Sequence, residues 1–360
     1  MNDLEQIISQ EIKEQGPITF YRFQEYCLYH PLHGYYNSSR HKIGKQGDFY
    51  TSPSVHPVFG ETIARFLLQK WEEIGKPSVY TVVEYGAGTG NMAHAILSEV
   101  ARCDSPIRTV FRYCIIERSP RLRSIQQEKL QGYPVSWIHS PSEIAPFDGC
   151  VVSNELIDAF PVHLVEKTKN GLQELYVDVD GNRFFEKRGD LSKPEIEEYI
   201  SAYVPHLING QKIEINLDAL AWLAEVGQSM RCGHVVTIDY GYTAEMLYHP
   251  SRIKGTLRGF RQHRLIENPF ESPGETDLTH DVNFTALMNY GESIGLETTF
   301  FGSQAEFLIQ AGILERLSVN EGNDPFRDEV LKRNMAIKHL ILPGVMGTAF
   351  QVLVQQRINV

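Results

Sequence analysis

The chain has 360 residues, a net charge of −11, and 42% hydrophobic and 22% charged residues. This length is enough for a large core with insertions, and the composition is typical of a globular protein. The acidic balance disfavours nucleic acid as a partner, because phosphate backbones are bound by clustered Lys and Arg. We therefore expect a protein or a small molecule as the partner. The sequence gives no indication of the oligomeric state.

The five cysteines contain no C-x-x-C pair, and their number is odd. This pattern indicates reduced thiols and predicts neither a disulfide framework nor a metal site. The N-terminal stretch "MNDLEQIISQEIKEQG" lacks the basic start and apolar run of a signal peptide. No run approaches the roughly 20 apolar residues of a membrane helix. The sequence therefore predicts a cytoplasmic location without membrane insertion.

The first part of the chain has helical periodicity. Residues 2–15 space their apolar side chains as one face of a helix, and Thr19 can cap a second helix that ends before Pro31. A long aromatic loop follows, and a third helix is expected over about 58–75. We predict a helical and loop-rich N-terminal extension over residues 1–75.

Beyond Val79, short apolar runs alternate with helical stretches, which predicts an α/β fold with a doubly wound, Rossmann-like sheet. Several runs are near-continuous in apolar residues, as buried parallel strands are. Seven strands are expected: "VYTVVEYG", "FRYCIIE", "VSWIHS", "GCVVSNELID", "HVVTIDYGY", "LETTFFGS" and "AFQVLVQQ".

Two stretches interrupt this alternation within the predicted domain of residues 76–360. The insertion at about 160–215 begins with period-two segments separated by Asn-Gly and Asp-Gly turns, which predicts an inserted antiparallel β meander. The insertion at about 242–281 is rich in Arg, His, Gly and Pro, and we expect it to be irregular.

The stretch "VEYGAGTG" at 83–90 places three glycines between an expected strand and an expected helix. A dinucleotide fingerprint would require glycine at Asn91, and no Gly-Lys-Ser/Thr follows for a phosphate loop. The pattern is instead E-x-G-x-G-x-G. It resembles motif one of S-adenosylmethionine-dependent methyltransferases, in which glycines let the backbone approach the cofactor closely. The predicted binding residues in this motif are Glu84, Gly86, Gly88 and Gly90.

An acidic residue at the end of the next strand is the second requirement of such a site. Glu117 ends "FRYCIIE" and is predicted to accept hydrogen bonds from both ribose hydroxyls of the cofactor. Asn154, at the end of the fourth strand, is a further predicted cofactor contact. The alternative is a glycine turn that holds no ligand.

Three carboxylates follow the fourth and fifth strands, at the edge where open α/β sheets bind ligands. A methyltransferase that acts on nitrogen needs acceptors there to orient the nucleophile and balance its charge. Glu155 is the first catalytic candidate, followed by Asp158 and Asp239. Asp158 could instead cap a helix, and Asp239 could be a turn residue.

Several unusual stretches together resemble the MidA-like methyltransferase family, which includes mitochondrial complex I assembly methyltransferases and bacterial relatives. They are "GDFYTSPSVHPVFGE", "VVEYGAGTG", "SNELIDAFPVH", "IDYGY", "GTLRGFRQHR" and "NPFESPGETDLTHDVNFTAL", in the family's order. The resemblance implies a class I methyltransferase sheet, S-adenosylmethionine as the cofactor, and methyl transfer to an arginine of a protein.

The two loop motifs of this set are expected to form a channel for the methyl acceptor. Asp48 and Tyr50 would line it from one loop, and His263 and Arg264 from the other. His263 could assist as a base, because the pKa of histidine lies near neutrality, although a structural histidine is an equal alternative. Two other functions stay open at this point: an assembly factor with vestigial catalysis, and a nicotinamide-dependent oxidoreductase.

Overall fold

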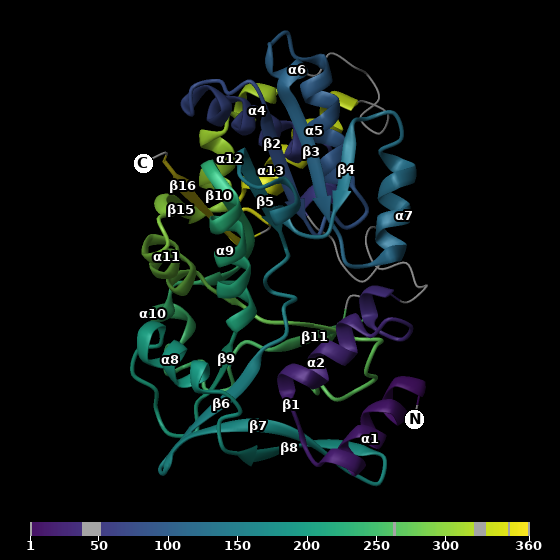
Figure 1. The fold of residues 1–360 in the computed structure, drawn as a ribbon, viewed down its shortest axis with the longest axis vertical. Helices are drawn as coiled ribbons and strands as arrows, with labels where there is room; N and C mark the ends of the chain where they lie inside the picture. Colours follow the sequence, from purple (N-terminus) through teal and green to yellow (C-terminus); the bar gives the residue numbers. More distant parts are fainter. Residues whose placement is uncertain (1, 38–51, 262–263, 320–328, 345, 359–360) are drawn as a thin grey trace. The chain divides into compact units, whose positions relative to one another are not determined.

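The computed structural model describes residues 2–37, 52–261, 264–319, 329–344 and 346–358 (Figure 1). The chain folds as two compact units. The first unit combines residues 1–41, 156–224 and 241–290, and the second combines 42–155, 225–240 and 291–360. These units divide the chain differently from the extension over 1–75 and the domain over 76–360, which stay a prediction about domain organisation.

The second unit is built on a large central sheet that contains all seven expected strands. Their order along the sheet is β15-β16-β10-β5-β2-β3-β4. An eighth strand, β14, pairs with the last two residues of β10, and these residues and β14 belong to the first unit. The strands are β2 (Tyr80–Tyr85), β3 (Phe111–Ile116), β4 (Val135–Ile138), β5 (Phe147–Asn154), β10 (Met230–Tyr242), β14 (Val282–Asn283), β15 (Glu297–Ser303) and β16 (Phe350–Arg357).

The order of the strands reverses between β2 and β5: from β2 the chain first adds β3 and β4 on one side, and then returns to add β5 and β10 on the other. The neighbours β2 and β5 are parallel, and Tyr85 lies opposite Ser153. The strands β3 and β4 continue in parallel on one side, and β10 does so on the other. β16 pairs antiparallel with both β10 and β15. Ligands of open α/β sheets bind outside the carboxyl ends of the strands at such a reversal.

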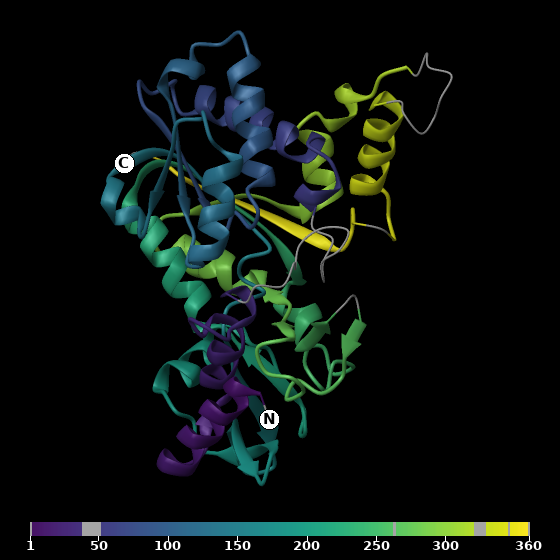
Figure 2. The same ribbon diagram turned by 90° about the vertical axis from the view of Figure 1, so that its right-hand side faces the viewer.

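Helices bury apolar faces against this sheet. The core of the second unit joins buried side chains of α4 (Val58–Glu73), α5 (Asn91–Arg102), α12 (Gln304–Gln310) and α13 (Glu329–Ile341) to those of the central strands. The helices α12 and α13 lie side by side, in yellow-green and yellow in Figure 2. The unit also contains α3 (Ser52–Val55), α6 (Ile107–Val110), α7 (Pro120–Lys129), η2 (Pro141–Ile144) and η3 (Ile313–Arg316).

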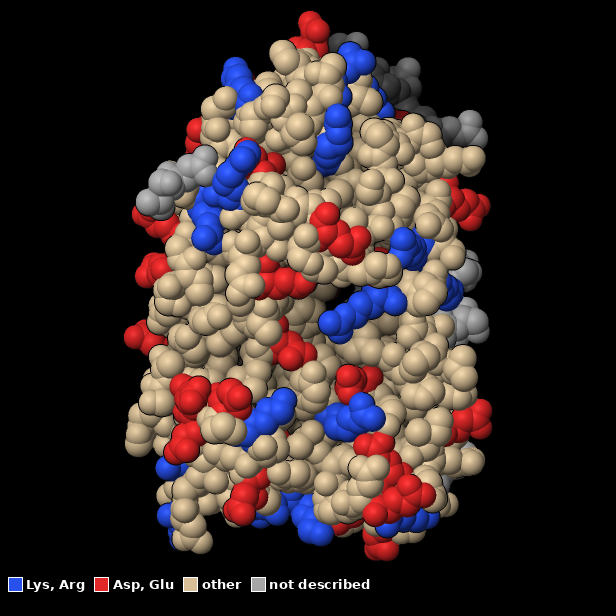
Figure 3. Space-filling view, in the orientation of Figure 1, with Lys and Arg blue, Asp and Glu red and all other residues tan. Residues whose placement is uncertain are grey.

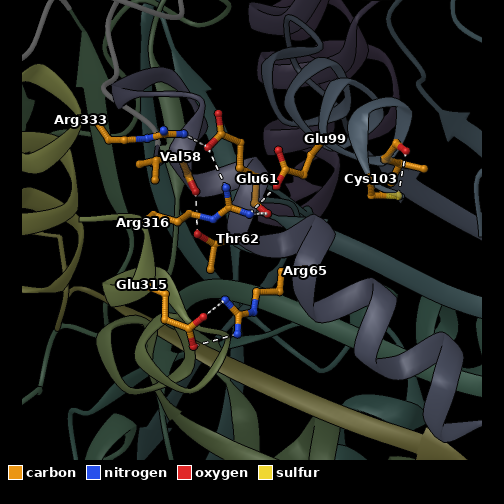
Figure 4. Close-up of polar contacts among 10 residues, drawn as sticks. Val58, Glu61, Thr62, Arg65, Glu99, Cys103, Glu315, Arg316 and Arg333 are labelled. Atoms are coloured by element: carbon orange, nitrogen blue, oxygen red, sulfur yellow. Dashed lines mark hydrogen bonds and ion pairs between the residues drawn. The ribbon is translucent and has the colours of Figure 1, made fainter. Parts of the chain in front are cut away.

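An ion-pair network attaches the C-terminal helices to α4 and α5 (Figure 4). Arg316 donates to Glu61 at 3.1 Å and to Glu99 at 2.7 Å, and Arg333 pairs with the same Glu61 carboxylate. Glu61 is only 8% exposed, so its loss would leave two guanidinium groups without their shared partner. The Arg65–Glu315 pair beside it is exposed and contributes little stability.

The first unit contains a five-stranded antiparallel sheet. Its members are β1 (Ile18–Thr19), β6 (His163–Thr168), β7 (Gly171–Asp180), β8 (Arg183–Gly189) and β9 (Lys212–Ile215), and the expected meander corresponds to β6, β7 and β8. β1 pairs with β7, so the N-terminal segment is part of this sheet. The helices are α1 (Asp3–Gln15), α2 (Phe20–Tyr29), η1 (Tyr35–Asn37), α8 (Pro194–Tyr203) and α10 (Ala244–Leu247). Two more, α9 (Leu217–Ser229) and α11 (Phe284–Ser293), continue into the second unit.

The expectation that residues 242–281 are irregular is wrong. β11 (Arg258–Arg261) pairs with β12 (Arg264–Ile266) and with β13 (Asp277–Thr279) in a three-stranded antiparallel sheet. These strands could not be predicted because they are only three or four residues long. In β11, "RGFR", a charged residue stands at each end and only Phe260 is apolar, so no alternation is visible. On the face drawn in Figure 3, acidic and basic side chains are interspersed, so the net charge of −11 does not form one patch there.

Candidate functional site

The glycine turn at 86–90 connects β2 to α5, beside the point where the strand order reverses. All three glycines have left-handed backbone conformations, with φ of 63° at Gly86, 53° at Gly88 and 76° at Gly90. Residues with a Cβ rarely adopt such angles. Gly86 N–H donates to the carbonyl of Ile116 at 2.9 Å, which ties the start of the turn to the end of β3. The turn is therefore ordered, and it carries no side chain at its three glycines.

The first turn of α5 begins at this loop. Gly90 is the N-cap of the helix and offers no side chain that could bond to the first backbone N–H groups. Helix N-termini of this kind direct N–H donors and a partial positive charge toward a ligand. The geometry suits a polar ligand group that approaches the backbone directly.

Glu84 is the second-last residue of β2, close to the turn, and is only 2% exposed. Its Oε2 accepts a hydrogen bond from the Tyr113 hydroxyl at 2.6 Å. Burial raises the pKa of Glu84 to about 7, the Tyr113 bond opposes this rise, and the nearby Glu117 carboxylate adds to it. The side chain can therefore change its charge near neutral pH.

This raised pKa predicts how the stability of the cofactor-free protein depends on pH. The folded-state pKa lies above the ordinary value of a glutamate, so the stabilising contribution is present at low pH and is lost as pH rises through about 7. We expect the unfolding temperature to fall as pH rises from about 5 to about 7. Glu84→Gln, which keeps an acceptor for Tyr113, should flatten this dependence, as measured by scanning calorimetry.

A control variant and a second titrating carboxylate make that measurement specific. Glu128→Gln changes an exposed glutamate of α7 and should leave the pH profile unchanged. Burial also raises the pKa of Asp158 to about 7, so Glu84→Gln should remove only part of the slope. A Glu84→Gln profile that overlays the wild-type profile would contradict the assignment.

Glu117 follows β3 and is fixed through both of its carboxylate oxygens. Oε1 accepts from the backbone N–H of Ser119 at 2.9 Å, and Oε2 accepts from the Gln126 side chain at 3.0 Å. Burial raises the pKa of Glu117, and the hydrogen bonds from Ser119 and Gln126 oppose the rise. A carboxylate oxygen has two lone pairs, so each oxygen can still accept a bond from a ligand hydroxyl.

The carboxyl end of β5 lies beside the glycine turn in the same sheet. Ser153 Oγ and Asn154 Oδ1 are buried there and have no hydrogen-bond partner among the described residues. A buried polar atom without a partner costs about 1–3 kcal/mol, so these atoms fit a bound ligand or water. Glu155 follows with a left-handed φ of 49°, and its carboxylate accepts from the Asn154 amide at 3.1 Å.

Asp239 lies inside β10 and is fully buried. It pairs in register with Gln351 of β16, and its Oδ1 accepts from the backbone N–H of Tyr240 at 2.9 Å. The alternative that Asp239 is a turn residue is therefore wrong, because the apolar pattern ends before the strand does.

A cluster of buried carboxylates lies within the first unit. Asp158 and Asp281 are each 5% exposed. Arg258 donates to Asp281 at 2.6 Å, and Arg252 lies 3.5 Å from the same carboxylate. Burial raises the pKa of Asp158 to about 7; Arg258 opposes this rise, and Asp281 adds to it. Residues 157–160 form a turn that no helix follows, so Asp158 is not a helix cap.

Sequence reasoning missed three other polar residues around Asp158. His280 donates its backbone N–H to the Asp158 carbonyl at 3.1 Å, and burial lowers the pKa of its imidazole to about 3. The Tyr36 hydroxyl donates to both oxygens of Asp277, at 3.1 and 3.3 Å. The chain positions of these residues give no signal, because the contacts join segments more than 100 residues apart.

The expected acceptor channel falls largely outside the described residues. Asp48, Tyr50 and His263 lie in the parts of the chain that the structure does not describe. Arg264 begins β12 and is exposed. The channel therefore stays a prediction. In the described ranges, no group of three or more His, Cys, Asp and Glu side chains could hold a metal ion.

A glycine turn after β2, an acidic residue after β3 and this order of strands are the features expected of a methyltransferase that uses S-adenosylmethionine. A model of the Methyltransf_28 family, described as an S-adenosyl-L-methionine-dependent methyltransferase, matches residues 62–302. The chain belongs to this family and is a MidA-like S-adenosylmethionine-dependent methyltransferase, as its motifs predicted. This membership leaves the nicotinamide-dependent alternative without support.

Relatives and a solved structure extend this similarity over nearly the whole chain. The human mitochondrial protein arginine methyltransferase NDUFAF7 is 28% identical over 94% of this chain and 80% of its own length. The rat protein of that name is 28% identical over 97% of this chain and 84% of its own length. A relative from Burkholderia thailandensis, bound to S-adenosylhomocysteine, is 31% identical with a TM-score of 0.87, over 98% of this chain and 92% of that one.

These relatives correct one prediction. The cytoplasmic location is contradicted, because the curated relatives are mitochondrial proteins. A signal-peptide pattern bears on only one route of targeting, so it gave no information on this point. Within the described part of the chain, no helix has the length and apolar character needed to cross a membrane.

Proposed function

We propose that this protein transfers a methyl group from S-adenosylmethionine to the guanidinium group of an arginine in a protein substrate. The relatives named as protein arginine methyltransferases support this choice of acceptor. The seven-strand path of the central sheet supports assignment to the class I methyltransferases, with residues 1–75 as an extension of the domain over 76–360.

The observation that carries the proposal is that the glycine turn and Glu117 follow neighbouring strands, β2 and β3, beside the point where the strand order reverses. The residues present fit the cofactor: three left-handed glycines leave the backbone open, and Glu117 keeps acceptor capacity on both oxygens. The proposed contacts are Glu84, Gly86, Gly88, Gly90, Glu117 and Asn154. S-adenosylmethionine supplies an electrophilic methyl group when it is bound.

The chain's own carboxylates would handle the charge and the proton of the acceptor. Arginine is protonated at neutral pH, so a methyltransferase must balance its charge and accept a proton as the nitrogen is methylated. Glu155 is the first candidate and Asp239 the second, and His263 is the candidate base. Asp158 suits proton acceptance, because burial brings its pKa to about 7. Asp48, Tyr50 and Arg264 are proposed to contact the acceptor.

The backbone of Glu155 gives this assignment a specific test. A non-glycine residue in the left-handed region costs about 1–3 kcal/mol, and such strain persists where a side chain is needed. We expect Glu155→Gly to raise the free energy of unfolding by about 1 kcal/mol and to lower kcat at least about 100-fold. Urea denaturation and a methyl-transfer assay measure the two effects.

Lys76→Gly is the matched control, because Lys76 is exposed and also has a left-handed φ, of 56°. It should relieve similar strain and leave kcat unchanged. Near-normal kcat in Glu155→Gly would remove Glu155 from the catalytic candidates and would leave the cofactor site untouched.

Mass spectrometry of methylarginine in whole-cell protein tests the proposed acceptor. Cells that lack this protein are compared with cells that express the wild type or Gly88→Val. We expect at least one arginine to be methylated only with the wild type. Equal methylation in all three would favour the alternative of an assembly factor with vestigial catalysis.

A further inference from the structure

Gln126 makes three hydrogen bonds from a fully buried position on α7. Its side-chain nitrogen donates to the Gly88 carbonyl at 2.9 Å and to Glu117 Oε2 at 3.0 Å. Its side-chain oxygen accepts from the indole N–H of Trp137, on β4, at 3.0 Å. Both amide protons and the amide oxygen are used, and the side chain has no exposed surface.

The indole N–H of Trp137 determines which way this amide faces. A flipped amide would bring its oxygen against two acceptors, the Gly88 carbonyl and the Glu117 carboxylate. It would also bring its NH₂ group against the indole donor. Three hydrogen bonds would be replaced by three repulsive contacts, in a buried place where unpaired polar groups are costly. Trp137 and the two acceptors together therefore set the orientation in which Gln126 holds Glu117.

The same face of α7 packs against the glycine turn. A Cβ added at Gly90 would lie 3.6 Å from Gln126 Cγ and 3.7 Å from Lys129 Cδ. Lys129 also donates to the Asn91 side chain at the start of α5. Residues 126 and 129 are three apart and share one helix face. That face thus contacts the turn at Gly88 and Gly90.

Gln126 consequently joins two parts of the site that come from different strands. The Gly88 carbonyl belongs to the turn after β2, and the Glu117 carboxylate follows β3. A single amide nitrogen that bonds to both sets the distance between them. Ser119, the N-cap of α7, fixes the other oxygen of Glu117. The carboxylate is thereby fixed at both oxygens by one helix.

We propose that Gln126 is a positioning residue for the cofactor. It holds the Glu117 carboxylate at a fixed distance from the glycine turn, so that both ribose hydroxyls of the cofactor meet their acceptors together. The inference rests on the proposed role of Glu117 as the ribose ligand. It adds that affinity for the ribose depends on a residue that does not itself touch the cofactor.

Isothermal titration calorimetry with two ligands tests this role. The ligands are S-adenosylhomocysteine and an analogue that lacks both ribose hydroxyls. The wild type should bind the analogue at least about tenfold more weakly. Gln126→Leu should weaken S-adenosylhomocysteine about tenfold and change the analogue less than about threefold. In a methyl-transfer assay, KM for S-adenosylmethionine should rise while kcat at saturation stays within about twofold.

Gln127→Leu is the matched control, because it makes the same chemical change at the adjacent, exposed position of α7. It should leave both affinities unchanged. Trp137→Phe removes the indole donor and keeps an aromatic ring. It should weaken S-adenosylhomocysteine about threefold and leave the affinity for the analogue unchanged. It serves as the test if Gln126→Leu does not fold.

The outcomes separate this inference from the proposed function. Equal weakening of both ligands in Gln126→Leu would show a merely structural role and overturn the inference. The same holds if Glu117→Ala weakens S-adenosylhomocysteine but Gln126→Leu and Trp137→Phe do not. If Glu117→Ala leaves the affinity unchanged, the ribose assignment itself is wrong and the inference fails with it.

Discussion

Gly88→Val should abolish binding of S-adenosylmethionine and S-adenosylhomocysteine. Gly88 has a φ of 53° in the middle of the turn, and a β-branched residue is a strong outlier there. The valine side chain would also occupy the space through which the backbone meets the ligand, and a shift of the turn would break the bond from Gln126 to the Gly88 carbonyl. We expect no measurable heat of binding by calorimetry and a stability loss of about 1–3 kcal/mol.

Gly75→Val separates loss of the site from backbone strain. Gly75 has a φ of 86°, and a Cβ added there would have open space around it. The substitution should therefore impose a similar backbone cost far from the turn, with normal affinity for the cofactor. Unchanged affinity in Gly88→Val would refute the cofactor site as assigned.

Glu117→Ala should weaken S-adenosylhomocysteine binding by at least about tenfold. The substitution removes the proposed acceptor of two ribose hydroxyls, and hydrogen bonds to a charged group contribute roughly 1.5–3 kcal/mol each. A loss of about 1.4 kcal/mol already corresponds to a factor of ten. Titration calorimetry measures the change directly.

Glu128→Ala, at an exposed position of α7, is the control and should leave the affinity unchanged. A structure with bound cofactor gives a second readout. If the ribose hydroxyls point away from Glu117 in that structure, the assignment fails even if the affinity falls.

The large sheet could be predicted because its signals are local. Runs such as "YTVVEY" and "CVVSN" are nearly continuous in buried apolar residues, which identifies them as central strands. The glycine turn was visible because left-handed backbone demands glycine at Gly86, Gly88 and Gly90. The position of Glu117 could be predicted because it directly follows the end of a strand, and its role stays a prediction.

The remainder depends on contacts between distant segments, which one sequence does not reveal. The pairing of β1 with β7 joins Ile18 to Val177, and no local pattern specifies a partner 159 residues away. Gln126 looks like any polar residue of a polar helix, and only the fold brings it to Gly88. The contact between Tyr36 and Asp277 likewise depends on the fold and has no signal in the sequence.

Methyl transfer by the purified protein tests the proposed arginine methyltransferase activity most directly. The wild type is incubated with S-adenosylmethionine that carries a tritiated methyl group, together with an extract of cells that lack this protein. Gly88→Val serves as the blank. We predict that label enters protein with the wild type only, and that acid hydrolysis releases it as methylated arginine. Label recovered on another amino acid would refute arginine as the acceptor, and no label above the blank would refute the proposed activity.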